Sequence, residues 1–383
     1  MSLLPIILLG PPVIYAAVLL LFWIGLFRKN LSQSGDRPRI SIVIAARNEE
    51  KTLPALLNDL KQQTYPSDRM EIIIADDHST DSTAAVIRQV AGQDARFQYI
   101  SVTGTIPGLT AKKNAMAQAI SMATGEIILC TDADCRVKPT WAECMVSWFL
   151  PDVGAVIGFS HLEPAADGSR FFQIMQTIDF LMLMTAAQGT ANLGHAWAAS
   201  GQNFAYRKKV YDEVGGFSKI GHRVSGDDVL FLQLIRKMTK WRIRFARNSK
   251  AHNRSRAELS ASDFFHQRTR WASNAAYQWK LNKPFFAYVV NTFLTNLILL
   301  ISVPAVLILP RTLPFFLAGW AVKGLSEACL FSKGTEVYGQ RRLRPYFPFW
   351  FAAQIPYVVL AGILGTTSAF IWKDRNHSVL EQS

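Results

Sequence analysis

Four apolar blocks near the two ends of this 383-residue chain limit its fold more than any other feature. Residues 3–27 carry no charge, and hydrophobicity returns in blocks at 285–309, 313–331 and 346–372. At 1.5 Å of rise per residue, about 20 helical residues cross a hydrocarbon core about 30 Å thick. We therefore expect residues 1–30 to hold a transmembrane anchor and the other three blocks to be transmembrane helices.

Charged residues inside the third block qualify this expectation. Lys323 and Glu327 lie one helical turn apart, at a spacing that lets them pair. Paired charges are tolerated inside a bundle of membrane helices. The block therefore still counts as a crossing.

Basic residues indicate the orientation. Arg28 and Lys29 follow the first block, and no cleavage site follows them, which favours a retained anchor over a signal peptide. The loop between the last two blocks holds Lys333, Arg341, Arg342 and Arg344. Because basic loops stay on the cytoplasmic side, we predict four crossings of a bacterial plasma membrane, a cytoplasmic central region, and a tail (373–383) outside, against which Lys373 and Arg375 argue weakly.

Composition narrows the partners. The chain is 50% hydrophobic and 18% charged, with a formal net charge of +13. An excess of positive charge favours anionic partners, namely nucleic acid, lipid headgroups or a phosphorylated substrate. No nucleic-acid recognition motif is present, so nucleic acid is not expected. The four cysteines form no CxxC pair and have no histidine at zinc-ligand spacing, which indicates a reducing compartment without a structural metal.

The polar central region, 36–283, alternates strand-like and helix-like segments. β-Branched apolar runs occur at 40–46, 71–75, 97–102 and 127–131, with helix-length segments between them. This alternation predicts an α/β domain with a mostly parallel sheet covered by helices. Ligands of such domains bind beyond the carboxyl ends of the strands, so the residues that follow each run are the candidate site.

The residues that follow these runs are acidic. Asp76 to Asp81 follow the second run, and they could simply cap the next helix. Asp132 and Asp134 follow the fourth run, where two carboxylates give a turn no obvious benefit. Carboxylates suit Mg²⁺ or Mn²⁺, whose remaining positions phosphate oxygens can fill. We therefore expect a divalent cation at Asp132 and Asp134.

Phosphate binding has no standard loop in this chain. Neither GxGxxG after a strand nor GxxxxGK[ST] occurs. The cationic candidates are Lys112, Lys113, Arg268 and Arg270, although a pair of lysines is often only a solvated surface.

Taken in order, these motifs resemble the membrane-embedded family 2 glycosyltransferases of the GT-A fold, which include cellulose, chitin and hyaluronan synthases and ceramide glucosyltransferase. The resemblance covers residues 38–275 and the membrane flanks. Its parts are Asp-Asp-x-Ser-x-Asp at 76–81, Lys112, Asp-x-Asp at 132–134, Gly-x-Asn at 201–203, the Asp227–Asp228 pair, and Gln-x-x-Arg-Trp at 267–271.

The resemblance implies a role for each of these positions. It implies an inverting, metal-dependent transferase that uses a nucleotide sugar, with UDP as the expected nucleotide, and a membrane lipid or growing glycan as acceptor. Asp228, or else Asp227, would be the general base. The implied donor-binding residues are Ala46, Glu49, Asp76, Asp77, Lys112, Asp132, Gln267 and Arg270. The implied acceptor-binding residues are Gly201, Asn203 and Trp271, and Asp134 with Asp132 would ligate the metal.

Two departures from the family pattern leave parts of this hypothesis open. The family usually has Glu-Asp or Thr-Glu-Asp at the base, whereas this chain has Ser225-Gly226-Asp227-Asp228. The acceptor motif is Ser200-Gly201-Gln202-Asn203, which matches no single characterised acceptor class.

Several alternatives remain at this level. Segment 171–185 could be an interfacial or a core helix, and 263–279 could be an interfacial helix that presents Gln267 and Trp271 on one face. The protein could add one sugar to a lipid, act as a processive polysaccharide synthase, or be a non-catalytic partner of a synthase. A transporter is disfavoured because no inverted repeat is visible.

Overall fold

The computed structural model describes residues 4–28, 33–165, 167–367, 370–372 and 375–377. Its centre is a seven-stranded sheet. In spatial order the strands are β3 (Phe97–Ser101), β2 (Met70–Asp76), β1 (Ile40–Ala46), β4 (Ile127–Cys130), β8 (Phe204–Arg207), β6 (Val153–Gly158) and β9 (Arg242–Ala246). Only β8 runs antiparallel to its neighbours in this sheet, β4 and β6. The predicted α/β fold with a mostly parallel sheet is confirmed.

Alternation along the strands explains why both faces of the sheet are covered. In β1, Ile42 and Ile44 belong to one buried cluster and Val43 to the other. Because successive side chains of a strand point to opposite faces, a strand that is apolar at every position must have a core on each side. The covering helices are α2 (Leu53–Lys61), α3 (Thr83–Ala91), α4 (Ala111–Met122), α5 (Trp141–Val146), α6 (Arg170–Asn192), α7 (Lys208–Glu213) and α8 (Val229–Met238).

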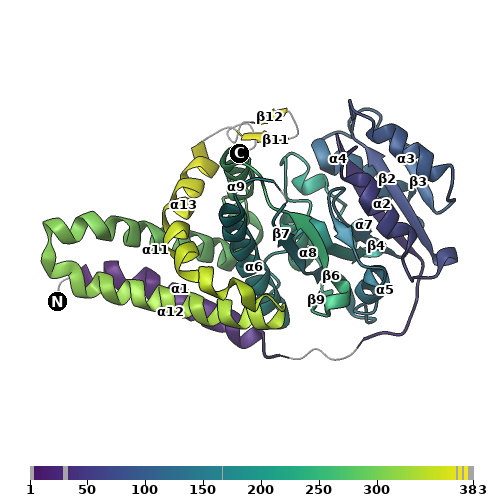
Figure 1. Cartoon of the computed structure of the whole chain (residues 1–383). Coiled ribbons are helices and arrows are strands. Elements are labelled where there is room, and N and C mark those ends of the chain that lie inside the picture. Colours follow the sequence, from purple (N-terminus) through teal and green to yellow (C-terminus); the bar gives the residue numbers. More distant parts are fainter. Residues whose placement is uncertain (1–3, 29–32, 166, 368–369, 373–374, 378–383) are drawn as a thin grey trace.

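Two small sheets complete the strands. One joins β5 (Arg136–Val137), β10 (Asn253–Arg256) and β7 (Ser160–Glu163), and the other is a hairpin of β11 (Phe370–Trp372) and β12 (Arg375–His377). The remaining long helices are α1 (Leu4–Gly25), α9 (Ala261–Ala272), α11 (Lys283–Ile308), α12 (Leu313–Val337) and α13 (Phe347–Thr367), with the short α10 (Gln278–Leu281) before α11. Figure 1 shows α1, α11 and α12 projecting together from one side of the sheet domain, with α6 and α9 between.

Three described stretches are long and apolar enough to cross a membrane: Pro5–Gly25, Lys283–Ile308 and Arg341–Thr367. Helix α12, expected as a further crossing, is not among them, so the four crossings stay a prediction. Its expected charge pair is present: the ammonium nitrogen of Lys323 lies 2.9 Å from both carboxylate oxygens of Glu327, and both side chains are fully buried. The Tyr15 hydroxyl donates to Glu327 at 2.7 Å, and Gln354 accepts from Lys323 at 2.5 Å. This network joins α1, α12 and α13.

Helix α6 connects the sheet domain to these helices. Most of its residues are buried, including Phe180 and Met184, so it is part of the core as well as a neighbour of α1 and α12. It crosses α1 where Gly189 faces Gly25, and a Cβ on either glycine would lie within 2.4 Å of a backbone oxygen of the other helix. Only glycine permits this separation.

The predicted helix at 263–279 is divided. Helix α9 ends at Ala272 and α10 begins at Gln278. The Ser273 hydroxyl donates to the carbonyl of Arg270 at 2.8 Å, and the Asn274 amide donates to Ser225 at 2.7 Å. Serine and asparagine side chains that bond in this way compete with helix continuation.

Candidate active site

A cavity of about 760 Å³ lies at the carboxyl edge of the parallel strands. Because β8 is antiparallel, its first residues reach the same edge as the ends of β1, β2 and β4. Most of the site residues predicted from the sequence line this cavity: Ala46, Glu49, Asp77, Lys112, Asp132, Asp134, Gly201, Asp227, Asp228, Gln267, Arg270 and Trp271. Segments far apart in the chain therefore meet at one place.

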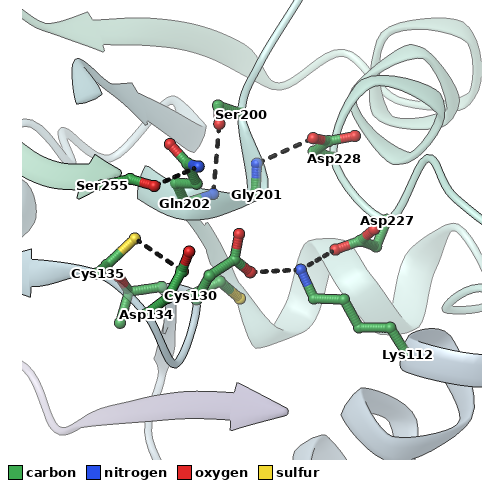
Figure 2. Close-up of polar contacts among 12 residues, drawn as sticks. Lys112, Cys130, Asp134, Cys135, Ser200, Gly201, Gln202, Asp227, Asp228 and Ser255 are labelled. Atoms are coloured by element: carbon green, nitrogen blue, oxygen red, sulfur yellow. Dashed lines mark hydrogen bonds and ion pairs between the residues drawn. The ribbon is translucent and has the colours of Figure 1, made fainter. Parts of the chain in front are cut away.

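Lys112, in the first turn of α4, joins two acidic loops. Its ammonium nitrogen lies 2.6 Å from Oδ1 of Asp132 and 2.9 Å from Oδ2 of Asp227 (Figure 2). Burial alone would lower the pKa of Lys112, but these carboxylates raise it well above its ordinary value. The cavity therefore holds a fixed positive charge between the loops after β4 and before α8.

The two neighbouring carboxylates differ in basicity. Burial tends to raise the pKa of Asp227, but Lys112 and Lys113 hold it below its ordinary value. Burial raises the pKa of Asp228, and the negative charge of Asp227 raises it further. Asp228 accepts the backbone N–H of Gly201 at 2.9 Å and that of Val229 at 2.5 Å, so it also caps α8. Asp228 is thus the stronger and more firmly oriented base of the pair.

Lys113 holds the loop that precedes Asp227 and Asp228. Its side chain is fully buried and donates to the carbonyls of Arg223 and Ser225, the latter at 3.0 Å. Burial lowers the pKa of Lys113 to about 8. Gly226 has φ of 97°, a left-handed conformation that glycine adopts without strain. Lys113 therefore positions Asp227 and Asp228 and is not a phosphate-binding group.

Asp132 and Asp134 suit a divalent cation by their chemistry. Both line the cavity just after β4, beside the Lys112 ammonium, and both offer only oxygen. The described residues contain no group of three or more His, Cys, Asp or Glu side chains arranged for a metal. Mg²⁺ or Mn²⁺ commonly takes one or two carboxylate ligands from the protein, and phosphate and water complete its coordination shell. The donor set fits such an ion.

The sequence profile described as "Glycosyl transferase family 2" matches residues 41–215. This part of the chain is similar to a family 2 glycosyltransferase domain. The matched range includes the cavity residues from Ala46 to Gly201, and it ends before Asp227 and the residues of α9.

Curated relatives agree with this match. The chain is 27% identical over 239 residues to a beta-monoglucosyldiacylglycerol synthase from Nostoc sp., covering 62% of this chain and 49% of that protein. It is 28% identical over 180 residues to a poly-beta-1,6-N-acetyl-D-glucosamine synthase from Staphylococcus epidermidis, covering 46% of this chain and 41% of that protein. The chain thus spans about half the length of the curated relatives it matches.

A solved structure supports the fold. A mannosyltransferase from Pyrobaculum calidifontis, in complex with GDP-Man and Mn²⁺, aligns over 94% of this chain and 99% of its own, with a TM-score of 0.58 and 20% identity. This likeness supports a GT-A fold for the family 2 domain and extends over the flanking helices.

Two of the predicted site residues do not line the cavity. Asp76 is buried and accepts the backbone N–H of Ser79 at 3.1 Å, which shapes the turn that presents Asp77. Asn203 is fully buried, donates to the carbonyls of Phe159 and Ala251, and accepts from Trp141 at 3.0 Å. In the structure both residues hold loops in place, and their binding roles stay predictions.

The Asp-Asp-x-Ser-x-Asp turn has a structural purpose, and the role of Asp77 in binding stays a prediction. Asp81 accepts the backbone N–H groups of Thr83 and Glu50 at 2.9 and 3.1 Å, and Ser79 accepts that of Asn48 at 3.1 Å. These bonds start α3 and tie the loop after β2 to the loop after β1. Asp77 instead lines the cavity.

A buried ion pair between Arg268 and Asp179 holds α9 so that its Gln-x-x-Arg-Trp motif lies at the cavity. Gln267 donates to Glu258 at 2.7 Å, which fixes the side chain at the rim. Arg268 lies 2.8 Å from Asp179 of α6, and its guanidinium lies 4.2 Å from the centre of the Trp271 ring. Arg268, a candidate phosphate ligand from sequence, is therefore buried in the core, and its neighbour Arg270 reaches the cavity instead.

Sequence reasoning missed several residues that line the cavity. They include Phe180, Leu183 and Met184 of α6, Glu258, His266, Gln278, and Phe285 and Val289 of α11. Apart from Glu258, nothing in the local sequence marks these positions, because the tertiary fold alone brings α6, α10 and α11 to the acidic loops. Only Glu258 had a usable signal, as an acid just after a strand.

Proposed function

We propose that this protein is a membrane glycosyltransferase that moves a sugar from a nucleotide sugar to a hydroxyl group of a lipid or glycan. The observation that carries the proposal is the arrangement of Asp132, Lys112, Asp227 and Asp228 within one cavity of a family 2 domain. A base, a fixed cation and a metal-type carboxylate pair at one site are what such a transfer needs. The relatives, which are named as glycolipid and polysaccharide synthases, support this class.

The proposed chemistry uses Asp228 as general base. Asp228 takes the proton of the acceptor hydroxyl while that oxygen bonds to the anomeric carbon. The bond from this carbon to the phosphate oxygen breaks, and the nucleoside diphosphate leaves from the opposite face with the bonding electrons. The configuration at the anomeric carbon is therefore inverted. Asp227, paired with Lys112, stays ionised.

Positive groups would stabilise the departing diphosphate. Lys112 and Arg270 line the same cavity and bring positive charge toward a leaving group that gains negative charge. Mg²⁺ or Mn²⁺, held by Asp134 with Asp132, would neutralise part of that charge without proton transfer. On the nucleotide side, Ala46, Glu49 and Asp77 are the proposed contacts. UDP is the expected nucleotide, and the GDP-Man complex of the structural neighbour makes GDP the second candidate.

The test is nucleotide release by the full-length protein in detergent, with UDP-sugars and GDP-sugars, with and without Mn²⁺ or Mg²⁺. We expect release from one nucleotide sugar, and its loss with EDTA. Asp228→Asn should lower kcat by at least about a hundredfold, since general base catalysis contributes 10²–10⁴. Asp134→Asn should raise the metal concentration needed.

The control is Asp212→Asn, which changes an exposed carboxylate on α7 by the same chemistry. It should leave release unchanged. If no nucleotide sugar is consumed while the protein stays folded, the proposal fails and the non-catalytic partner becomes the better hypothesis. Assignment of the anomeric configuration by NMR tests the inversion separately, since an α-linked (axial) donor should give a β-linked (equatorial) product.

A further inference from the structure

The cavity has two chemically different ends. Asp132, Asp134 and Asp228 lie at its charged end. The apolar end of the lining comes from α6 and α11, which contribute Leu183, Phe285 and Val289. A water-soluble sugar acceptor gains nothing from an apolar wall, whereas an amphipathic molecule can occupy both ends at once.

The apolar end lies where α11 begins. Phe285 and Val289 are one turn apart on one face of α11, and Lys283–Ile308 is one of the stretches able to cross a membrane. Leu183, which also lines the cavity, is 46% exposed. The apolar end is therefore open at the level where the predicted span enters the bilayer. This position lets a lipid reach the cavity sideways from the membrane.

The same cavity contains a buried polar atom without a partner among the described residues. Gln278 lines the cavity and is only 2% exposed, and its amide oxygen has no hydrogen-bond partner among the described residues. Its helix, α10, contacts both α8, which Asp228 caps, and α11. A buried acceptor atom without a donor costs stability, so a ligand that supplies an O–H there gains a hydrogen bond.

The separation between the base and the apolar end is fixed. Asn282 caps α11 by accepting the N–H of Phe285 at 3.1 Å, and its amide donates to Gln233 of α8 at 2.8 Å. One side chain therefore joins the helix that begins at Asp228 to the helix that carries Val289. A ligand that reaches both ends must match this fixed distance.

We propose that the acceptor is a membrane lipid with an acyl chain and a free hydroxyl, that its chain lies between α6 and α11, and that Gln278 binds its polar part. This inference rests on the proposed function and names the acceptor class of the same site. The hydroxyl proton passes to Asp228 as its oxygen bonds to the sugar, and the nucleoside diphosphate leaves with the bonding electrons.

The test uses full-length protein in phosphatidylcholine vesicles that contain a total extract of bacterial membrane lipid, with the nucleotide sugar radiolabelled. We expect the label in an organic-soluble product. Diacylglycerols with long and short acyl chains, added one at a time, then probe the proposed acyl-chain slot between α6 and α11. Short chains should raise KM for the lipid. Label found only in a water-soluble polymer, or equal use of a soluble oligosaccharide, would overturn the inference.

Paired variants test the residues. Val289→Gln places a polar group in the slot and should raise KM for the lipid about tenfold, whereas Val290→Gln, at the adjacent exposed position that does not line the cavity, should not. Gln278→Ala should raise KM for the lipid about tenfold, the effect of one hydrogen bond, without raising KM for the nucleotide sugar. Equal effects of the two valine variants would contradict the slot.

These outcomes distinguish failure of the proposed function from failure of the lipid acceptor. If the wild-type protein releases no nucleotide from any nucleotide sugar, the proposed function fails. If it releases nucleotide and labels only a soluble glycan, the proposed function stands and the lipid acceptor is wrong.

Discussion

The Lys112 ammonium gives two adjacent carboxylates different properties. It lies 2.9 Å from Asp227 and leaves Asp228 beside a permanent negative charge. A pair of like charges that share a site titrates at separated pKa values, one lowered and one raised. The group with the raised pKa suits a general base, and the other serves as a fixed negative charge.

This separation predicts a pH profile. The base must be ionised, so kcat/KM should fall on the acid side as pH drops through the raised pKa of Asp228, above the usual range for aspartate. Asp227→Asn removes the negative charge that raises this pKa, so the acid limb should move to lower pH even if the rate is reduced. The measurement is kcat/KM of nucleotide release against pH. A limb that stays in place or moves upward would assign the base elsewhere.

At the residue scale the sequence indicated chemistry better than position. Asp132 and Asp134 stood out because carboxylates at the end of a strand have few structural uses, whereas Asp228 was indicated by the family resemblance. All three line the cavity. The choice between Asp227 and Asp228 depended on which one Lys112 touches, which no local pattern encodes. Asn203 fitted an acceptor motif, but its amide is used by Trp141 and two carbonyls.

At the scale of elements, the contact between α1 and α6 depends on a missing side chain. A Cβ on Gly189 would lie 2.4 Å from the carbonyl oxygen of Phe22, whereas a Cβ on Gly10 would meet nothing within 4 Å. We expect Gly189→Ala to destabilise the protein by about 1–3 kcal/mol through overpacking. Gly10→Ala, in the same helix pair, should not destabilise it. Thermal unfolding in detergent tests the pair, and equal midpoints would contradict the close packing.

The buried charge pair of α12 gives a second prediction. Lys323→Met leaves Glu327 buried without its cation, and removal of one partner of a buried pair costs about 3–5 kcal/mol. The double change Lys323→Met with Glu327→Leu should cost less. Lys333 and Glu336 form a more exposed pair on the same helix, so Lys333→Met is the matched control and should change the unfolding midpoint little. Similar losses for Lys323→Met and Lys333→Met would contradict this reading.

Elements differed in how well the sequence predicted them. The strands β1, β2, β3 and β4 follow β-branched runs, and their observed bounds lie within one residue of the predictions. The break between α9 and α10 was missed because the Asn274 amide bonds to Ser225, a partner 49 residues away that no local pattern reveals. The reversal of β8 was equally invisible, since a four-residue strand carries no mark of direction.

At the scale of the whole molecule, α13 packs against other helices at both of its ends. Phe347 stacks on Phe331 near the end of α12, and a Cβ on Gly365 would collide with Ala272 of α9. Helix α11 leaves the domain and α12 returns to it, so their connecting turn, near Arg311, is distant from the domain (Figure 1). This arrangement favours crossings by α1, α11 and α12. Helix α13 lies along the domain side, although its stretch, Arg341–Thr367, is also long and apolar enough to cross a membrane and α12 is not among such stretches.

A topology experiment tests this arrangement. With Cys329 changed to serine, a cysteine at Arg311 should react with a membrane-impermeant thiol reagent on intact cells. A cysteine at Asn376, beyond α13, should react only after permeabilisation. This outcome places the end of α13 on the cytoplasmic side, opposite to the expectation from four crossings. Reaction of both positions on intact cells would restore that expectation.

The members of the charge network of α12 are synthesised in a fixed order. Chains are made from the N-terminus, so if α1 spans the bilayer as predicted, it inserts before its partners in α6, α11 and α12 have been made. Helix α1 carries no charged residue, so it is stable in the bilayer without other helices. Helix α12 is not, because Lys323 and Glu327 need hydrogen-bonding partners in the hydrocarbon core. When Lys323 and Glu327 are synthesised, Tyr15 of α1 is already present to donate a hydrogen bond to Glu327. Gln354 of α13 is made last and completes the network by accepting from Lys323.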